Sequence, residues 1–270
     1  MTTHIAHLNC ATMRPVGSFG GRGLPSDMVA HCLLVERPEG LLLVDTGFGT
    51  ADLADPRRLG RPFVTMVRPS FDPAETARAQ VEARGFTCDD VTDIALTHLD
   101  LDHAGGLSDF PRARVHVFAD ELDAARNPKL NERARYVAGQ WAHHPTWVEH
   151  RPSGEEWFGF TAVQALGDDV VLVPLTGHTR GHCGVAVRRP GGGWLLHAGD
   201  SYFYAGETLT PPTYQRGLTV FQTLMAANNG QRRANQERLR TLRADHGDEV
   251  LVFSAHDRSE YAALAAAESH

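Results

Sequence analysis

Short runs of apolar residues alternate with polar, turn-forming segments along most of the chain. Residues 30–45 (AHCLLVERPEGLLLVD) predict two strands joined by a turn at 38–40, and residues 91–97 (VTDIALT) predict a short apolar strand. Further β-type runs occur at 170–176 (VVLVPLT), 194–199 (WLLHAG) and 250–254 (VLVFS).

Helical signals separate these runs. Residues 72–84 begin with a capping pattern, in which Asp72 is the expected N-cap and Glu75 completes a capping box, and Gly85 ends the pattern. Two more helices are expected at 231–245 and 257–268. Strands mixed with helices in this order predict an α/β or α+β layer protein.

The stretch of about 120–165 is less regular and rich in aromatic residues. Its aromatic side chains include Trp141, Trp147, Trp157, Phe158 and Phe160. We expect a helical, aromatic insertion here, within a single domain that spans residues 1–270.

Composition narrows the class of protein. The formal net charge of −7 argues against a nucleic-acid partner, since such binders usually present a basic face. The four cysteines form no CxxC pair, the first residues have no apolar signal core, and no apolar run is long enough to span a membrane. The expectation is a cytoplasmic protein with a small-molecule substrate and no membrane partner; the oligomeric state stays open.

The strongest chemical signal is the segment 97–106 (THLDLDHAGG), directly after the strand at 91–97. In an extended segment the alternating side chains of His98, Asp100 and Asp102 turn to one side. Together with His103, these groups would repel and desolvate one another if no cation lay between them. A solvated acidic loop is the alternative, and the apolar Leu99 and Leu101 at the intervening positions disfavour it.

Three other apolar runs also end in a residue that can bind a metal. The runs at 170–176, 194–199 and 250–254 lead to His178, Asp200 and His256. Strand ends at one edge of a sheet are where active sites are usually built. Four such strand ends supply enough ligands for two metal ions.

The motifs THLDLDHAGG, GHTRGH, HAGD and SAHD, with LLLVDTGFG upstream, resemble the ordered motifs of the metallo-β-lactamase superfamily over residues 30–260. The resemblance implies a four-layer αββα sandwich with two divalent metal ions in a cleft at one edge. It implies a first site of His98, Asp100 and His178, a second site of Asp102, His103 and His256, and Asp200 as the bridge. Asp45 falls at the superfamily's upstream aspartate, which is either a support for a ligand histidine or a cap of its own turn. Within the superfamily, the chain looks most like the lactonase branch, which includes acyl-homoserine lactone hydrolases.

The expected function is hydrolysis of an ester or lactone through a metal-bridging hydroxide, with Asp102 also moving a proton to the leaving group. Tyr202 or Tyr204, just past Asp200, is expected to donate a hydrogen bond to the developing oxyanion. His182 and His197 are expected either to support the ligands or to pack as buried structural histidines. Zinc is the expected metal, with iron or manganese as the alternatives.

One position departs from the usual motif, which has His where Asp100 stands. An added carboxylate makes the site less positive and favours harder metals such as iron or manganese. The alternatives therefore include a thioesterase of the glyoxalase-II type, a phosphodiesterase, and a redox diiron protein. A catalytically silent binding module is disfavoured, because every ligand position holds a competent residue.

Overall fold

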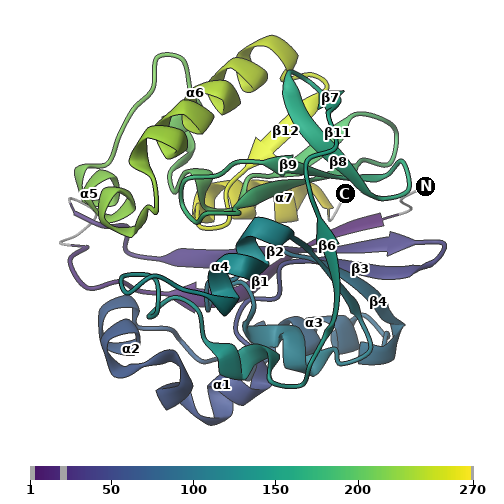
Figure 1. Cartoon of the computed structure of the whole chain (residues 1–270), viewed down its shortest axis with the longest axis vertical. Helices are drawn as coiled ribbons and strands as arrows, with labels where there is room; N and C mark the ends of the chain where they lie inside the picture. The colour runs from purple at the N-terminus through teal and green to yellow at the C-terminus, as the bar shows by residue number, and fades with distance from the viewer. Residues whose placement is uncertain (1–3, 19–22, 269–270) are drawn as a thin grey trace.

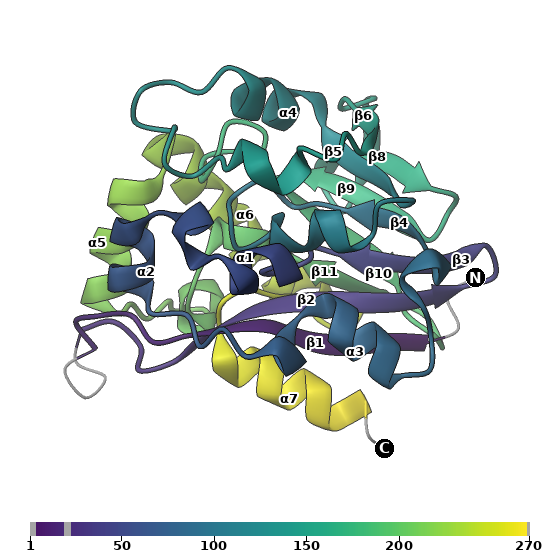
Figure 2. The same ribbon diagram turned by 90° about the horizontal axis from the view of Figure 1, so that it is seen from below.

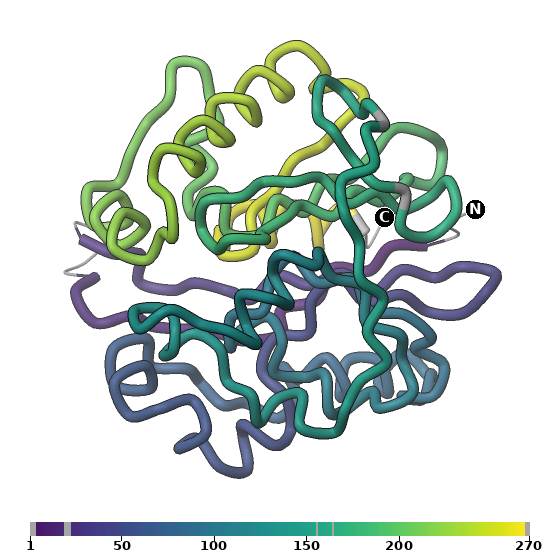
Figure 3. The backbone as a smooth tube through the Cα atoms, viewed as in Figure 1, coloured from purple at the N-terminus to yellow at the C-terminus, as the bar shows by residue number. Residues whose placement is uncertain are grey.

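The computed structural model describes residues 4–18 and 23–268. Within these ranges the strands form two six-stranded sheets. The first has the order β1-β2-β3-β4-β5-β6 and the second the order β12-β11-β10-β9-β8-β7, so the chain builds one sheet before the other. The backbone trace follows this division, from the purple and blue half of the molecule to the green and yellow half (Figure 3).

The first sheet is antiparallel from β1 to β3 and parallel from β3 to β6. Its strands are β1 (His4–Met13), β2 (Met28–Arg37), β3 (Gly40–Val44), β4 (Val91–Ala95), β5 (Arg114–Phe118) and β6 (Thr146–His150). The second sheet is antiparallel except where β11 pairs with β12. Its strands are β7 (Glu155–Trp157), β8 (Phe160–Leu166), β9 (Val170–Pro174), β10 (Cys183–Arg188), β11 (Trp194–His197) and β12 (Val250–Phe253).

The helices are α1 (Thr50–Ala54), α2 (Arg61–Val67), α3 (Ala77–Ala83), α4 (Ala119–Arg126), α5 (Arg216–Met225), α6 (Asn229–His246) and α7 (Arg258–Glu268). Helices α3 and α4 lie on the outer face of the first sheet and α6 lies on that of the second, and the sheets lie face to face between these helices (Figures 1 and 2). This is the predicted four-layer αββα arrangement. No helix in the described ranges is long and apolar enough to cross a membrane.

The sequence of β2 is apolar at nearly every position because both faces of this strand are covered. Leu33 and Val35 point into the core between the sheets, together with Leu172 of β9. Leu34, between them, points to the opposite face, into the core under α3 and α4. Because successive side chains of a strand alternate between faces, a strand covered on both faces needs a continuous apolar run.

The predicted helix at 72–84 is shorter and begins later. Asp72 caps only a single 3-10 turn at Pro73–Glu75, and α3 begins after Thr76, whose hydroxyl accepts a hydrogen bond from the backbone N–H of Ala79. The Glu75 carboxylate accepts the backbone N–H of Thr12 at 2.7 Å and does not close a capping box. A tertiary contact with β1 overrides the local helix signal.

The prediction of a helical insertion at about 120–165 is wrong for most of that stretch. Its helical parts are α4 and a 3-10 turn at Ala138–Trp141. In contrast, β6 and β7 are the edge strands of the first and second sheets, and β8 pairs with both β7 and β9. β-Branched and aromatic residues favour such half-buried strands. Trp157 and Phe160 pack in the core between the second sheet and α6.

Candidate metal centre

The candidate ligands lie where strands of both sheets end. Strands β3, β4 and β5 are parallel, so their carboxyl ends share one edge of the first sheet. The pairing of β9 to β12 likewise brings the ends of β9, β11 and β12 to one edge of the second sheet. The loop after β4 then faces His178, Asp200 and His256.

The first cluster consists of His98, His178 and Asp200, whose facing ligand atoms all lie within 4.8 Å of one another. Asp200 Oδ2 is 3.4 Å from His178 Nε2 and 3.9 Å from His98 Nε2. Asp100 adjoins this cluster, with its Oδ2 3.0 Å from His178 Nε2 and 3.5 Å from His98 Nε2.

The second cluster consists of Asp102, His103 and His256, again within 4.8 Å. The Asp102 carboxylate lies 3.9 Å from His103 Nε2 and 3.8 Å from His256 Nε2. Asp200 Oδ1 is 3.3 Å from His103 Nε2 and 3.2 Å from His256 Nε2. Asp200 Oδ2 also lies 3.2 Å from His256 Nε2. The Asp200 carboxylate therefore lies between the clusters, with Oδ1 facing the second cluster and Oδ2 facing atoms of both.

The donor atoms fit metal ions. His98 Nε2, His103 Nε2 and Asp200 Oδ1 are buried and have no hydrogen-bond partner among the described residues. Buried polar atoms without a partner indicate an ion or water that binds there. A tetrahedral ion with ligands about 2.0–2.2 Å away holds neighbouring ligand atoms about 3.4 Å apart, and most of the separations above lie close to that spacing.

Contacts on the side of the ring away from the cluster orient two of the candidate histidine ligands. His98 Nδ1 lies 2.9 Å from Thr97 Oγ1, and His256 Nδ1 lies 2.7 Å from the Val29 carbonyl oxygen. These contacts leave Nε2 of each ring facing the cluster, which is how metal-binding histidines are usually oriented.

Asp45 holds the ring of His103, with its Oδ2 2.8 Å from His103 Nδ1. It also accepts hydrogen bonds from the Thr97 backbone N–H and hydroxyl at 2.8 and 2.7 Å. Burial alone would raise the pKa of Asp45, but His103 outweighs burial and lowers that pKa to about 2. Of the two roles expected for Asp45, the supporting one is what the geometry shows.

His182 and His197 hold the turn that carries Asp200. His182 donates from Nδ1 to the Leu175 carbonyl at 2.9 Å and accepts the Asp200 backbone N–H at Nε2, also 2.9 Å away. Burial and two neighbouring imidazoles lower the pKa of His182 well below its ordinary value, so the ring is neutral and can accept this bond. His197 accepts the Gly199 backbone N–H at 3.1 Å.

Asp100 is paired with a residue that the sequence did not single out. Arg135 Nε lies 3.2 Å from Asp100 Oδ1, and both side chains are almost fully buried. Burial alone would raise the pKa of Asp100, but the Arg135 guanidinium and the adjacent His98 hold it well below its ordinary range. The extra negative charge expected at this position is thus balanced within the protein by the Arg135 guanidinium.

Glu121 on α4 also supports the site, and the sequence does not predict this role. Its buried carboxylate accepts hydrogen bonds from the backbone N–H of Leu99 and of Gly181, both at 3.0 Å, and from the Thr179 hydroxyl at 2.6 Å. It thereby joins the loop of His98 to the loop of His178. In the sequence, nothing distinguishes Glu121 from a solvated glutamate on a helix.

The two tyrosines just past Asp200 have different surroundings. Tyr202 is fully buried, and its hydroxyl donates to the Glu260 carboxylate at 3.0 Å. Tyr204 packs with Phe203 and neighbouring apolar residues and is not among the described residues that line the cavity above the clusters. The expectation that Tyr202 serves the reaction is therefore wrong, and the role of Tyr204 stays a prediction; Phe203 lines the cavity between them.

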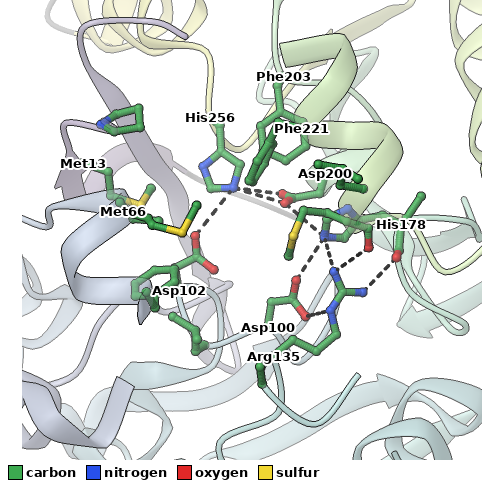
Figure 4. Close-up of a pocket in the computed structure, with 18 of the residues that line it drawn as sticks. Met13, Met66, Asp100, Asp102, Arg135, His178, Asp200, Phe203, Phe221 and His256 are labelled. Atoms are coloured by element: carbon green, nitrogen blue, oxygen red, sulfur yellow. Dashed lines mark hydrogen bonds and ion pairs between the residues drawn. The ribbon is translucent and has the colours of Figure 1, made fainter. Parts of the chain in front are cut away.

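A cavity of about 360 Å³ opens directly above the clusters. Asp100, Asp102, His178, Asp200 and His256 line its floor, and Arg135 lies beside Asp100 (Figure 4). The walls come mainly from α2, α5 and the segment 131–135. Most of the wall residues are apolar, and they include Met13, Met28, Phe63, Met66, Phe203 and Phe221; Asn131 and Glu132 are polar exceptions. The arrangement is a buried set of metal-binding groups beneath an apolar pocket.

Such a site at the edge of an αββα sandwich defines the class of protein, and comparison with known proteins agrees. The family model of the metallo-beta-lactamase superfamily matches residues 26–256. A probable metallo-hydrolase of Mycobacterium tuberculosis is 44% identical over 261 residues, which cover 95% of this chain and 81% of that protein. The chain belongs to the metallo-β-lactamase superfamily.

Similarity to lactonases is weaker in sequence and clear in fold. The N-acyl homoserine lactonase AttM of Rhizobium radiobacter is 26% identical over 189 residues, which cover 68% of each chain. The structure of an N-acyl homoserine lactone hydrolase with N-hexanoyl-L-homoserine at its catalytic metal centre matches with a TM-score of 0.75 and 19% identity, over 97% of each chain. The fold is therefore the one that these lactonases have.

Proposed function

We propose that this protein is a dinuclear metal-dependent hydrolase that acts on lactones or carboxylic esters with an apolar acyl group. The observation that carries the proposal is Asp200, whose two oxygens lie between two clusters of metal-binding groups on the floor of an apolar cavity. His98, Asp100, His178 and Asp200 would hold one ion, and Asp102, His103, His256 and Asp200 the other. Divalent ions bound there would supply Lewis acidity and lower the pKa of a water molecule.

The side chains around the ions have distinct tasks. Burial alone would raise the pKa of Asp200, but three surrounding imidazoles outweigh burial and hold it well below its ordinary range, so Asp200 is a permanent carboxylate. Asp102 is the more accessible acid, with 15% of its side chain exposed toward the cavity. It is therefore the group that we assign to carry a proton to the leaving oxygen.

The walls of the cavity support an apolar substrate. Methionine, phenylalanine and leucine side chains surround the space above the ions, and methionine adapts to chains of different shape. Burying an acyl chain there stabilises the bound ester and excludes water from its carbonyl group. Among the described residues that line these walls, Arg135 is the one cationic side chain, and its guanidinium already pairs with Asp100, so the described walls do not favour a phosphodiester.

The names of the relatives suggest the first substrates to test. AttM and the structural neighbour described above act, by name, on N-acyl homoserine lactones. The experiment offers the metal-loaded protein N-acyl homoserine lactones, simple lactones, carboxylic esters, thioesters and phosphodiesters, with Asp200→Asn purified in parallel to exclude a contaminating hydrolase.

The expected result is turnover of a lactone or carboxylic ester by the wild-type protein and at least a hundredfold less by Asp200→Asn. Turnover confined to thioesters or phosphodiesters would contradict the proposal. So would oxygen consumption with a reductant in the absence of any hydrolysis, which is the behaviour of a diiron redox protein.

A further inference from the structure

Arg135 makes four contacts around the first cluster, one of which joins its Nη2 to His178 Nε2 at 3.5 Å. Its Nε lies 3.2 Å from Asp100 Oδ1. Its Nη1 donates to the His178 carbonyl oxygen at 2.8 Å, and its Nη2 donates to the Met225 carbonyl oxygen at 3.0 Å. Arg135 therefore holds a side chain of one ligand loop, the backbone of another, and the end of helix α5 (Figure 4).

The two oxygens of Asp100 have different partners. Oδ1 is the oxygen that faces Arg135, whereas Oδ2 faces the Nε2 atoms of His178 and His98 at 3.0 and 3.5 Å. Only 7% of the Arg135 side chain and 10% of the Asp100 side chain are exposed. A charge buried to this extent needs an opposite charge, so each side chain depends on the other.

We propose that Asp100 and Arg135 act as one neutral unit that takes the place of a histidine ligand, and that Arg135 positions Asp100 Oδ2 at the metal centre. The carboxylate contributes one negative charge and the guanidinium one positive charge, so the pair leaves the net charge of the site as a neutral imidazole would. The inference rests on the metal centre of the proposed function and is independent of the substrate.

A clear consequence concerns the substitution that restores the usual motif. In Asp100→His alone, the buried guanidinium of Arg135 keeps its charge, loses its carboxylate and repels the ion at the first site. Removing that charge as well, in Asp100→His/Arg135→Met, relieves the repulsion. The second substitution should therefore rescue the first, which a residue that only supports the fold would not do.

The experiment measures metal per chain by elemental analysis, and zinc affinity by competition with a chromophoric chelator. It compares the wild-type protein, Asp100→His, Arg135→Met and the double variant. The matched control is Arg240→Met: this arginine is also mostly buried and donates to a backbone carbonyl, that of Glu207 at 2.9 Å, away from the metal centre.

We expect about two ions per chain in the wild-type protein and in Arg240→Met. Arg135→Met, which removes the partner of a ligand, should bind zinc at the first site roughly tenfold to hundredfold more weakly. Asp100→His, which leaves the buried guanidinium unpaired beside the ion, should lose at least as much. The double variant should regain most of that loss. If His does not fit at this position, Asp100→Asn with and without Arg135→Gln repeats the comparison with side chains closer in size.

Two results would overturn the inference alone: full zinc affinity in Asp100→His, or a double variant that binds no better than Asp100→His. A wild-type protein that binds no metal would overturn the proposed function and this inference together. Because none of these measurements uses a substrate, failure of the lactone or ester assignment leaves the inference standing.

Discussion

The ring of Phe203 stacks on the imidazole of His256, with ring centroids 4.9 Å apart and planes inclined by 24°. Phe203 thus forms the cavity wall directly beside one of the candidate ligands. The adjacent Tyr202 lies in the core between the second sheet and α6, where its hydroxyl binds Glu260. The hydroxyl that the sequence offered for an oxyanion therefore serves the stability of the fold.

Tyr202→Phe should leave catalysis unchanged and weaken the fold. The substitution removes one hydrogen bond between buried groups, and such a loss typically costs about 1 kcal/mol of unfolding free energy. The measurements are kcat/KM on the best substrate of the panel and urea unfolding of the same preparation. A drop of tenfold or more in kcat with unchanged stability would show that the Tyr202 hydroxyl takes part in the reaction.

Glu260 should make the stability of the metal-free protein depend on pH. Burial, together with the nearby Asp257, raises the pKa of Glu260 from 4.5 to about 7. Below pH 4.5 both the folded and the unfolded states hold the proton. Between pH 4.5 and about 7 the unfolded state releases it first, so stability falls as pH rises, by about 2–3 kcal/mol from this group.

Glu260→Gln should remove that fall. Relative to the wild-type protein, the variant should gain about 2–3 kcal/mol of unfolding free energy between pH 4.5 and 7.5, measured by urea unfolding in the presence of a chelator. Glu39→Gln, at an exposed turn residue, is the control and should follow the wild-type curve. If the unfolding free energies of Glu260→Gln and the wild-type protein change with pH in the same way, the folded protein does not retain the proton of Glu260 above pH 4.5.

Asp200→Asn should damage metal binding more than His182→Asn. The Asp200 carboxylate lies between the two clusters. His182, in contrast, binds the backbone N–H of Asp200 and not its carboxylate. We expect less than one ion per chain in Asp200→Asn, and an affinity loss of roughly tenfold to hundredfold in His182→Asn. The exposed Asp123→Asn should keep the wild-type content, and equal losses in the first two variants would refute the bridging role.

Longer acyl chains should be better substrates until they fill the cavity of about 360 Å³. Each buried methylene contributes about 0.8 kcal/mol, which corresponds to about a fourfold rise in kcat/KM. The measurement is kcat/KM along a series of straight-chain acyl lactones from butanoyl to decanoyl. A flat series would show that the acyl group lies outside the apolar walls.

Met66→Glu tests the same wall from its rim. Met66 lines the cavity and is 65% exposed, so a glutamate there should be tolerated by the fold. We expect kcat/KM to fall about tenfold for a decanoyl substrate, as for roughly two lost methylene contacts, and to change little for a butanoyl substrate. Val220→Glu is the control, since Val220 is 60% exposed but is not among the cavity-lining residues. Equal effects of the two variants would contradict the assignment.

The candidate ligands could be predicted because each stands in a short motif at the end of an apolar strand. The runs before His178, Asp200 and His256 correspond to β9, β11 and β12, and strand ends at one edge bring distant residues together. Strands β1, β5 and β10 had no such marker and were not predicted. The sequence predicts a helical insertion where β6, β7 and β8 lie, because the apolar residues of these strands alternate over too few positions to fix a period.

Other parts of the site depend on directions that a linear sequence does not encode. A 3-10 turn at Gly199–Ser201 sends Tyr202 into the core and Phe203 to the cavity, so adjacent aromatic residues exchange the expected roles. Arg135 stands 35 positions after Asp100 and two positions after Arg133, and only the folded chain shows that Arg135 is the buried one of the two arginines. Charge balance at a site therefore requires the structure, even where the ligand motif does not.

The central claim is that Asp200 lies between two metal ions. Crystals of the protein grown with zinc, measured on both sides of the zinc absorption edge, test it directly through the anomalous difference map. We predict two peaks in each chain, one beside Asp200 Oδ2 near His98 and His178, and one beside Asp200 Oδ1 near His103 and His256. A single peak, or none beside Asp200 in metal-supplemented crystals, would contradict it.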